Sequence, residues 1–321
     1  MGSVLVLLAS ADLFTNAVEW SGLYLKANQS STGSVLAAVG TGLPEALIAV
    51  VAIAFGVHFS GVAVGIGAIV GAPFMLATLT LPLVGLAVMV RGGSKSLDLD
   101  PRSVAEDLGV FCVLFAIGAI LSIAPIDRPG RVVVAVLLLL AYGAYVRRVM
   151  KTEGRMLEVP SRLRFHPGSD RPHLGLIAVQ LGLSLATMLG ASLVFVRSLS
   201  GVASGLGVSA LVLSLVLTPV ATELPEKLNS ILWLARGKDV LAVGNVTGAM
   251  AFQSAVPLSV GLAFTNWHLQ PPALYAMFLA LIGTAFTAAL VLRLRRLDPR
   301  WLMINGILYG LYLVYVFRVA L

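Results

Sequence analysis

Two glutamates stand inside apolar stretches of this sequence, and each directly follows the dipeptide Leu-Pro. Residues 38–45 read Ala-Val-Gly-Thr-Gly-Leu-Pro-Glu, and residues 219–226 read Pro-Val-Ala-Thr-Glu-Leu-Pro-Glu. Proline has no N–H for the helical ladder and glycine favours helix poorly, so we expect both segments to interrupt a helix. In lipid, the carbonyls freed by such a break must line a polar cavity, where they can bind a cation. Glu45 and Glu226 would add carboxylate oxygens at the same place.

The chemistry of two opposed carboxylates in an apolar setting follows from their charge. An ionised carboxylate at the centre of a membrane costs about 2.5–3.5 kcal/mol, and two of them repel unless a proton or a cation lies between them. Calcium suits such a site, because it binds roughly six to eight oxygens in irregular geometry. Zinc and copper would prefer histidine or cysteine, and neither occurs in the two segments. Without calcium, sodium ions or protons must neutralise the same pair, and this mutual exclusion is the physical basis of exchange.

The two segments belong to an internal repeat. Residues 39–56 align without gaps on residues 220–237 with 8 of 18 positions identical, and residues 67–72 match residues 244–249. Five predicted helices separate the corresponding elements, and an odd number reverses the direction of the second copy. We therefore expect two inverted halves, 1–148 and 174–321, joined by a loop over 149–173. Such an architecture places a substrate site near the bilayer midplane, where broken helices of the two halves meet.

The composition explains what must position these segments. The chain has 321 residues, of which 58% are hydrophobic and only 12% charged, and its mean hydropathy is +0.96. Soluble domains carry about 25% charged residues, whereas apolar runs of about 20 residues, the length that crosses a bilayer, recur along this chain. We expect an all-α polytopic membrane protein with ten transmembrane helices, over residues 4–25, 33–56, 60–91, 103–124, 129–148, 174–197, 206–235, 239–264, 271–293 and 300–320.

The basic residues predict the orientation of the chain. If the N-terminus lies outside, the inner loops carry 17 lysines and arginines and the outer side carries 4, as the positive-inside rule requires. Both termini are then outside the plasma membrane and the 149–173 loop is cytoplasmic. The net charge of +7 is thereby explained by topology, so nucleic acid is not an expected partner.

The motifs resemble those of the calcium/cation antiporter superfamily, which includes the sodium/calcium exchangers. Residues 11–14 with Glu19 resemble the first helix of that family, residues 40–45 and 221–226 its two Gly-Thr-Ser-Leu-Pro-Glu segments, and residues 244–253 its second Gly-Asn segment. The resemblance implies ten helices in inverted halves, a central calcium site and alternating access. It also implies the ligands: the carboxylates of Glu45 and Glu226, the hydroxyls of Thr41 and Thr222, the carbonyl of Ala38, and Gln253 where the family has Asn or Asp.

Several positions depart from the family pattern and leave the coupling ion open. Glu223 stands where the family has serine, and other hydroxyl or amide ligands are lost at Gly42, Ala72, Leu76 and Ala249. A smaller number of oxygen ligands and an added acid fit proton coupling. The motif Gly-Thr-x-Leu-Pro-Glu, by contrast, resembles that of the sodium-coupled branch of the family. We expect exchange of Ca²⁺ for Na⁺, with Ca²⁺/H⁺ exchange through Glu223 as the alternative.

Other charged residues have structural as well as functional interpretations. Glu223 lies four residues before Lys227, a spacing at which helical residues can pair, so an ion pair is as probable as a transport role. Asp12 is expected to cap or pair structurally more often than to serve the ion path. Glu106 and Asp107 fall near the predicted start of the fourth helix, where the helix dipole favours negative charge.

The same residues limit the class of function. No nucleophile–base set lies in the helices and no phosphate-binding loop is present, so we expect neither an enzyme nor an ATP-driven pump, and no cofactor. The expected partners are the lipid bilayer and the transported ions, and no oligomer is required. A passive cation channel is the alternative class, because it would use similar oxygens without requiring that the ions exclude one another. In an antiporter, the first and sixth helices would slide or rock.

Overall fold

The computed structural model describes residues 2–55, 59–91, 97–124, 126–205, 223–294 and 298–320. The described chain forms helices and no strand, which confirms the all-α prediction for these residues. The first half contains α1 (Gly2–Tyr24), α2 (Gln29–Ser31), the π-helix η1 (Thr32–Ala37), α3 (Ala38–Phe55), α4 (Phe59–Met75), the π-helix η2 (Leu76–Thr80), α5 (Leu81–Arg91), α6 (Pro101–Ile123) and α7 (Arg128–Lys151). The second half contains α8 (Leu174–Gly205), α11 (Leu224–Ala235), α12 (Asp239–Gln253), α13 (Val256–Phe264), α14 (Pro271–Leu294) and α15 (Pro299–Ala320).

Six described helical stretches are long and apolar enough to cross a membrane. They are Gly65–Arg91, Pro101–Ile123, Arg128–Lys151, Asp239–Phe264, Pro271–Leu294 and Pro299–Arg318. Each coincides with a span predicted from the sequence, and the chain is an integral membrane protein. The count of ten spans stays a prediction.

The first copy of the repeat is helical where the sequence predicted an interruption. Residues 38–55 form one α-helix through Pro44, and the irregular geometry lies one turn earlier in η1. The prediction of a break over residues 40–45 is therefore wrong. Single π-helical turns often mark functional sites within α-helices, and this one leads directly into the segment of Thr41.

The second copy is arranged differently from the first. Helix α11 begins at Leu224, directly after Glu223, so that Pro225 occupies the first turn, where its missing N–H costs nothing. The predicted helix over 239–264 is in fact two helices, because the chain turns at Ser254–Ala255 between α12 and α13. Pro257, in the first turn of α13, cannot donate to the ladder across this turn.

Two prolines interrupt the regular geometry of the predicted third helix. The five π-helical residues of η2 lie between Pro73 and Pro82 and join α4 to α5. Thr78, inside this segment, donates its hydroxyl to the carbonyl of Phe74 at 2.7 Å. The two prolines lack the N–H groups that would extend the helical hydrogen bonds here. The Thr78 hydroxyl supplies a donor to this stretch from a side chain instead.

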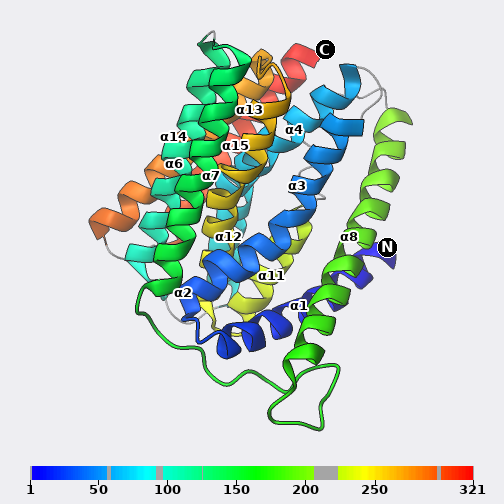
Figure 1. The fold of residues 1–321 in the computed structure, drawn as a ribbon, viewed down its shortest axis with the longest axis vertical. Helices are drawn as coiled ribbons and strands as arrows, with labels where there is room; N and C mark the ends of the chain where they lie inside the picture. Colours follow the sequence, from blue (N-terminus) through cyan, green and yellow to red (C-terminus); the bar gives the residue numbers. More distant parts are fainter. Residues whose placement is uncertain are drawn as a thin grey trace.

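Helix α12 is the centre of the bundle, and α1 and α8 lie side by side at its edge (Figure 1). Helix α12 contacts η1, α3, α6 and α11, and all 15 of its residues are buried. Two glycines of α12 allow a close approach to η1. Added Cβ atoms would come within 3.1 Å of the Ser34 hydroxyl oxygen from Gly244 and within 2.2 Å of the Ser34 carbonyl oxygen from Gly248. The backbones of η1 and α12 touch because these positions carry no side chain.

Substitution of Gly248 tests this close approach. Gly248→Ala places a methyl group against the Ser34 carbonyl and should destabilise the protein by about 1–3 kcal/mol, the usual cost of overpacking. The measurement is the thermal denaturation midpoint in detergent. Gly143→Ala is the matched control, because Gly143 also lies within a helix but a Cβ there meets nothing within 4 Å. Equal midpoints for the two variants would contradict the proposed contact.

Candidate cation site

Glu226 lies in the first turn of α11 and has an unusual environment. Its side chain is fully buried, and neither carboxylate oxygen has a hydrogen-bond partner within the described part of the chain. The helix N-terminus favours a negative charge at this place, but a helix dipole is weaker than a full counter-charge. The hydroxyl of Thr41 lies against this carboxylate, so the two repeated segments meet here.

Thr41 is held by its own helix. Its side chain is fully buried, and its hydroxyl donates to the carbonyl of Ala37 at 3.1 Å. The Thr41 oxygen also has lone pairs that can bind a cation. Ala38, the first residue of α3, is also fully buried, one turn before Thr41.

Asn245 fixes the position of the Glu226 backbone. Its amide nitrogen donates to the Glu226 carbonyl at 3.2 Å and to the Ser230 hydroxyl at 3.1 Å. Ser230 in turn donates to the carbonyl of Ala242 at 3.0 Å. This buried chain of bonds ties the first two turns of α11 to α12. Asn245 belongs to the Gly-Asn motif seen in the sequence. The spacing of that motif did not show that Asn245 binds the backbone of Glu226 in another segment.

Glu223 forms the ion pair that its spacing allowed. The Lys227 ammonium lies 2.9 Å from its Oε2, and the exposed fractions of the two side chains are 7% and 0%. Gln253, the last residue of α12 before the chain turns, also lies against Glu223. The interpretation of Glu223 as one half of a structural pair therefore has a geometric basis. A buried pair broken on one side would leave a buried unpaired charge.

Two of the predicted ligands lie at least partly outside the described part of the chain. Thr222 lies outside the described residues, and so does the side chain of Glu45, although the backbone of Glu45 is helical. The meeting of Glu45 with Glu226 therefore remains a prediction. The described residues Ala38, Thr41, Glu223, Glu226 and Gln253 belong to the adjoining segments η1–α3, α11 and α12.

The arrangement can bind a hard cation. Its described side-chain groups are carboxylate, hydroxyl and amide, which suit calcium or sodium rather than a soft transition metal. No group of three or more His, Cys, Asp or Glu side chains that could hold a metal occurs among the described residues.

The two acids of α1 are paired outside this site. Asp12 accepts hydrogen bonds from Arg164 at 2.9 Å and from Arg236, as the structural interpretation predicted. Glu19 is buried and accepts from the Trp233 indole at 2.9 Å and from Lys238. Both acids thus connect α1 to the end of α11 and the turn that follows it.

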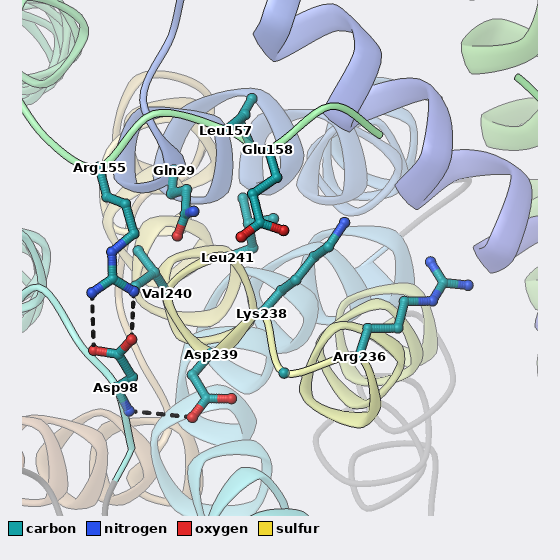
Figure 2. Close-up of a pocket in the computed structure, with 11 residues that line it drawn as sticks. Gln29, Asp98, Arg155, Leu157, Glu158, Arg236, Lys238, Asp239, Val240 and Leu241 are labelled. Carbon is teal, nitrogen blue, oxygen red and sulfur yellow. Dashed lines mark hydrogen bonds and ion pairs between the residues drawn. The ribbon is translucent and has the colours of Figure 1, made fainter. Parts of the chain in front are cut away.

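A separate cavity of about 230 Å³ lies beside the turn between α11 and α12. Figure 2 shows Arg155 of the 152–173 segment paired with Asp98, whose backbone N–H donates to Asp239 at 3.2 Å. Asp239 also pairs with Arg91 at 2.6 Å. The hydrogen bond to Asp98 raises the pKa of Arg155. Two of the acids that line the cavity thus already have cationic partners, which makes it a poor candidate for the cation site.

Comparison with known proteins gives the family. Residues 1–151 and 176–321 match the family model described as "Sodium/calcium exchanger protein". The chain is 30% identical over 124 residues to "Putative antiporter CaxA" of Alkalimonas amylolytica, an alignment that spans 37% of this chain and 39% of that protein. It is 24% identical over 241 residues to "Inner membrane protein YrbG" of Escherichia coli K12, over 75% of this chain and 71% of that protein.

Solved structures show the same fold. The sodium-calcium exchanger NCX_Mj soaked with Na⁺ and Ca²⁺ superimposes with a TM-score of 0.73 at 19% identity, over 97% of this chain and 95% of that one. The same exchanger soaked with Na⁺ and Sr²⁺ gives a TM-score of 0.74 at 20% identity, with the same coverage. Since the family model matches nearly the whole length, the chain belongs to the sodium/calcium exchanger protein family, whose members are membrane transporters.

Proposed function

We propose that this protein is a secondary antiporter that exchanges Ca²⁺ for Na⁺ by alternating access. The observation that supports this most strongly is the Glu226 carboxylate, which is fully buried without a hydrogen-bond partner in the described chain. A buried carboxylate is stable only when a proton or a cation neutralises it. An ion that comes and goes at Glu226 must therefore be replaced by another positive charge.

In this proposal the two repeated segments share the ion. Glu45 and Glu226 bind calcium from opposite sides, and Thr41 and Thr222 contribute hydroxyl oxygens. The carbonyl of Ala38 joins the shell, and Gln253 binds the ion or orients a carboxylate. The contact between Thr41 and Glu226 supports this set, as does the position of Gln253 at the end of α12.

The Glu223–Lys227 pair favours sodium over protons as the coupling ion. A pair 2.9 Å apart has no net charge, so Glu223 adds no free acid to the site. For Glu223 to carry protons, Lys227 would have to lose its buried partner in each cycle, which costs about 3–5 kcal/mol. Proton coupling through Glu223 is the alternative that the experiments below separate.

We also propose the two inverted halves, residues 1–148 and 174–321, joined by the segment 149–173. Contacts within the molecule support this, because those of one half have counterparts in the other. The contact between α3 and α4 in the first half corresponds to the contact between α11 and α12 in the second half. Two contacts between the halves also correspond to each other: α4 contacts α14, and α12 contacts α6. Likewise, α7 packs on α13 as α15 packs on α5.

Alternating access would move α1 and α8 against the rest. Figure 1 shows α1 crossing the lower part of the bundle beside α8, rather than running along its length. The ion pairs of Asp12 with Arg236 and of Glu19 with Lys238 hold α1 to the α11–α12 turn. These pairs must open or exchange partners if α1 slides. The distribution of basic residues supports a plasma-membrane orientation with both termini outside and the 149–173 loop in the cytoplasm.

Reconstituted vesicles test the exchange and the role of Glu226 together. Vesicles loaded with Na⁺ should take up radioactive calcium from a sodium-free medium, whereas a pH gradient alone should not drive uptake. Glu226→Gln should lower the sodium-driven rate at least about a hundredfold, because a buried charged ligand is worth several kcal/mol.

Glu158→Gln is the control for removal of an acid, since Glu158 is exposed and should leave the rate unchanged. Wild-type uptake by Glu226→Gln would remove the central residue of the proposal. Uptake with a pH gradient alone would favour the proton alternative, and calcium flux without any opposing gradient would indicate a channel.

A double substitution separates the two interpretations of Glu223. Glu223→Gln alone leaves Lys227 buried and unpaired and should destabilise the protein by about 3–5 kcal/mol. Glu223→Gln combined with Lys227→Met removes both charges and should restore most of that stability, with sodium-driven exchange retained. The readouts are the thermal denaturation midpoint and vesicle uptake. A stable double variant that has lost exchange would show that Glu223 itself takes part in transport.

A further inference from the structure

A second buried acid lies on α6, away from the residues of the cation site. Asp107 is fully buried, and three hydroxyl groups donate to its carboxylate. Ser34 and Thr247 donate to Oδ2 at 2.7 and 2.6 Å, and Tyr145 donates to Oδ1 at 2.7 Å. The expectation that Asp107 serves the start of a helix is wrong, because α6 begins at Pro101 with Asp100 as its cap. Asp107 instead joins η1, α7 and α12 to α6.

Among the described residues, no basic side chain pairs with Asp107. On its own helix, Glu106 faces outward and pairs with Arg148 of α7 at 3.0 Å. From α7, the phenol groups of Tyr145 and Tyr142 face the acid. No charged residue occurs in η1 or α13, and the charged residues of α12 and α14 are confined to Asp239 in the first turn and Arg293 in the last. A carboxylate buried among hydroxyls alone has either an uncompensated charge or a proton.

The hydrogen-bond geometry can accept a proton without loss of a partner. Thr247 has a second acceptor, the carbonyl of Val243 at 3.1 Å. When a proton binds Oδ2, Asp107 can donate it to the Thr247 oxygen while the Thr247 hydrogen turns to Val243. Ser34 and Tyr145 keep their bonds to the carboxyl group. A metal ion, by contrast, would have to enter between oxygens that are already 2.6–2.7 Å apart.

The same contacts connect Asp107 to the elements of the cation site. Ser34 lies seven residues before Thr41 on the continuous helical stretch η1–α3. Thr247 lies six residues before Gln253 on α12. The two hydroxyls that donate to Oδ2 thus come from the two elements whose backbones touch at Gly248.

We infer that Asp107 is a proton-binding site, separate from the cation site and placed where η1 meets α12. One proton adds to Oδ2 and one hydroxyl hydrogen changes acceptor, with no other bond made or broken. The effect of this site on calcium exchange rests on the function proposed above, but its protonation does not.

Infrared difference spectroscopy of the full chain in lipid tests the protonation directly. The acid-minus-alkaline spectrum of the wild type should contain a protonated-carboxyl band that Asp107→Asn removes. Tyr145→Phe takes a donor from the ionised form and should raise the midpoint of that band by about one pH unit. Tyr142→Phe is the matched control, because the Tyr142 hydroxyl has no hydrogen-bond partner in the described chain, and the midpoint should stay in place.

Two results would overturn the inference: a carboxyl spectrum unchanged by Asp107→Asn, or a midpoint that Tyr145→Phe does not move. If Asp107→Asn fails to fold, the band midpoints of Tyr145→Phe and Tyr142→Phe still test whether Asp107 binds the proton. In vesicles, sodium-driven calcium uptake should show a pH-dependent phase that Tyr145→Phe shifts in the same direction. A protein that titrates as described but exchanges no calcium would contradict the proposed function and leave the proton site standing.

Discussion

An acidic side chain removed from water, with no hydrogen-bond partner in the described part of the chain, is the constraint on which the rest of this structure depends. Glu226 is fully buried, and no described group donates to its oxygens. The surroundings hold it in place: α11 starts just before it, Asn245 binds its carbonyl, and α12 packs closely on η1 because Gly248 has no side chain. The described part of the fold thus holds a buried carboxylate that none of its own groups pairs with.

The other buried acids show why Glu226 stands apart. Each of them has polar partners in the described part of the chain: lysine and indole for Glu19, three hydroxyls for Asp107, lysine for Glu223, and arginine for Asp239. Since buried charges in proteins are normally paired or hydrogen-bonded, an exception inside a repeated motif is best explained by a transported ion. In the proposed function, the paired acids belong to the framework and Glu226 binds the transported ion.

Local patterns in the sequence predicted local features of the structure. They did not predict contacts between segments that lie far apart along the chain. The apolar runs gave most helices to within a few residues, and the four-residue spacing of Glu223 and Lys227 anticipated their ion pair. The turn at Ser254 was missed, because the apolar run continues through it without a charge. Asp107 was misjudged, since its three partners come from elements up to 140 residues away, and no spacing along the chain reveals such a contact.

The most direct test of the account is calcium binding to the purified protein by calorimetry, in sodium-free buffers that differ in ionisation enthalpy. If calcium replaces other positive charges at the buried acids, binding should release protons, and added sodium should weaken the calcium affinity in a concentration-dependent way. Calcium that bound with the same affinity in the presence and absence of sodium, and released no protons, would contradict the claim that these ions compete for one site.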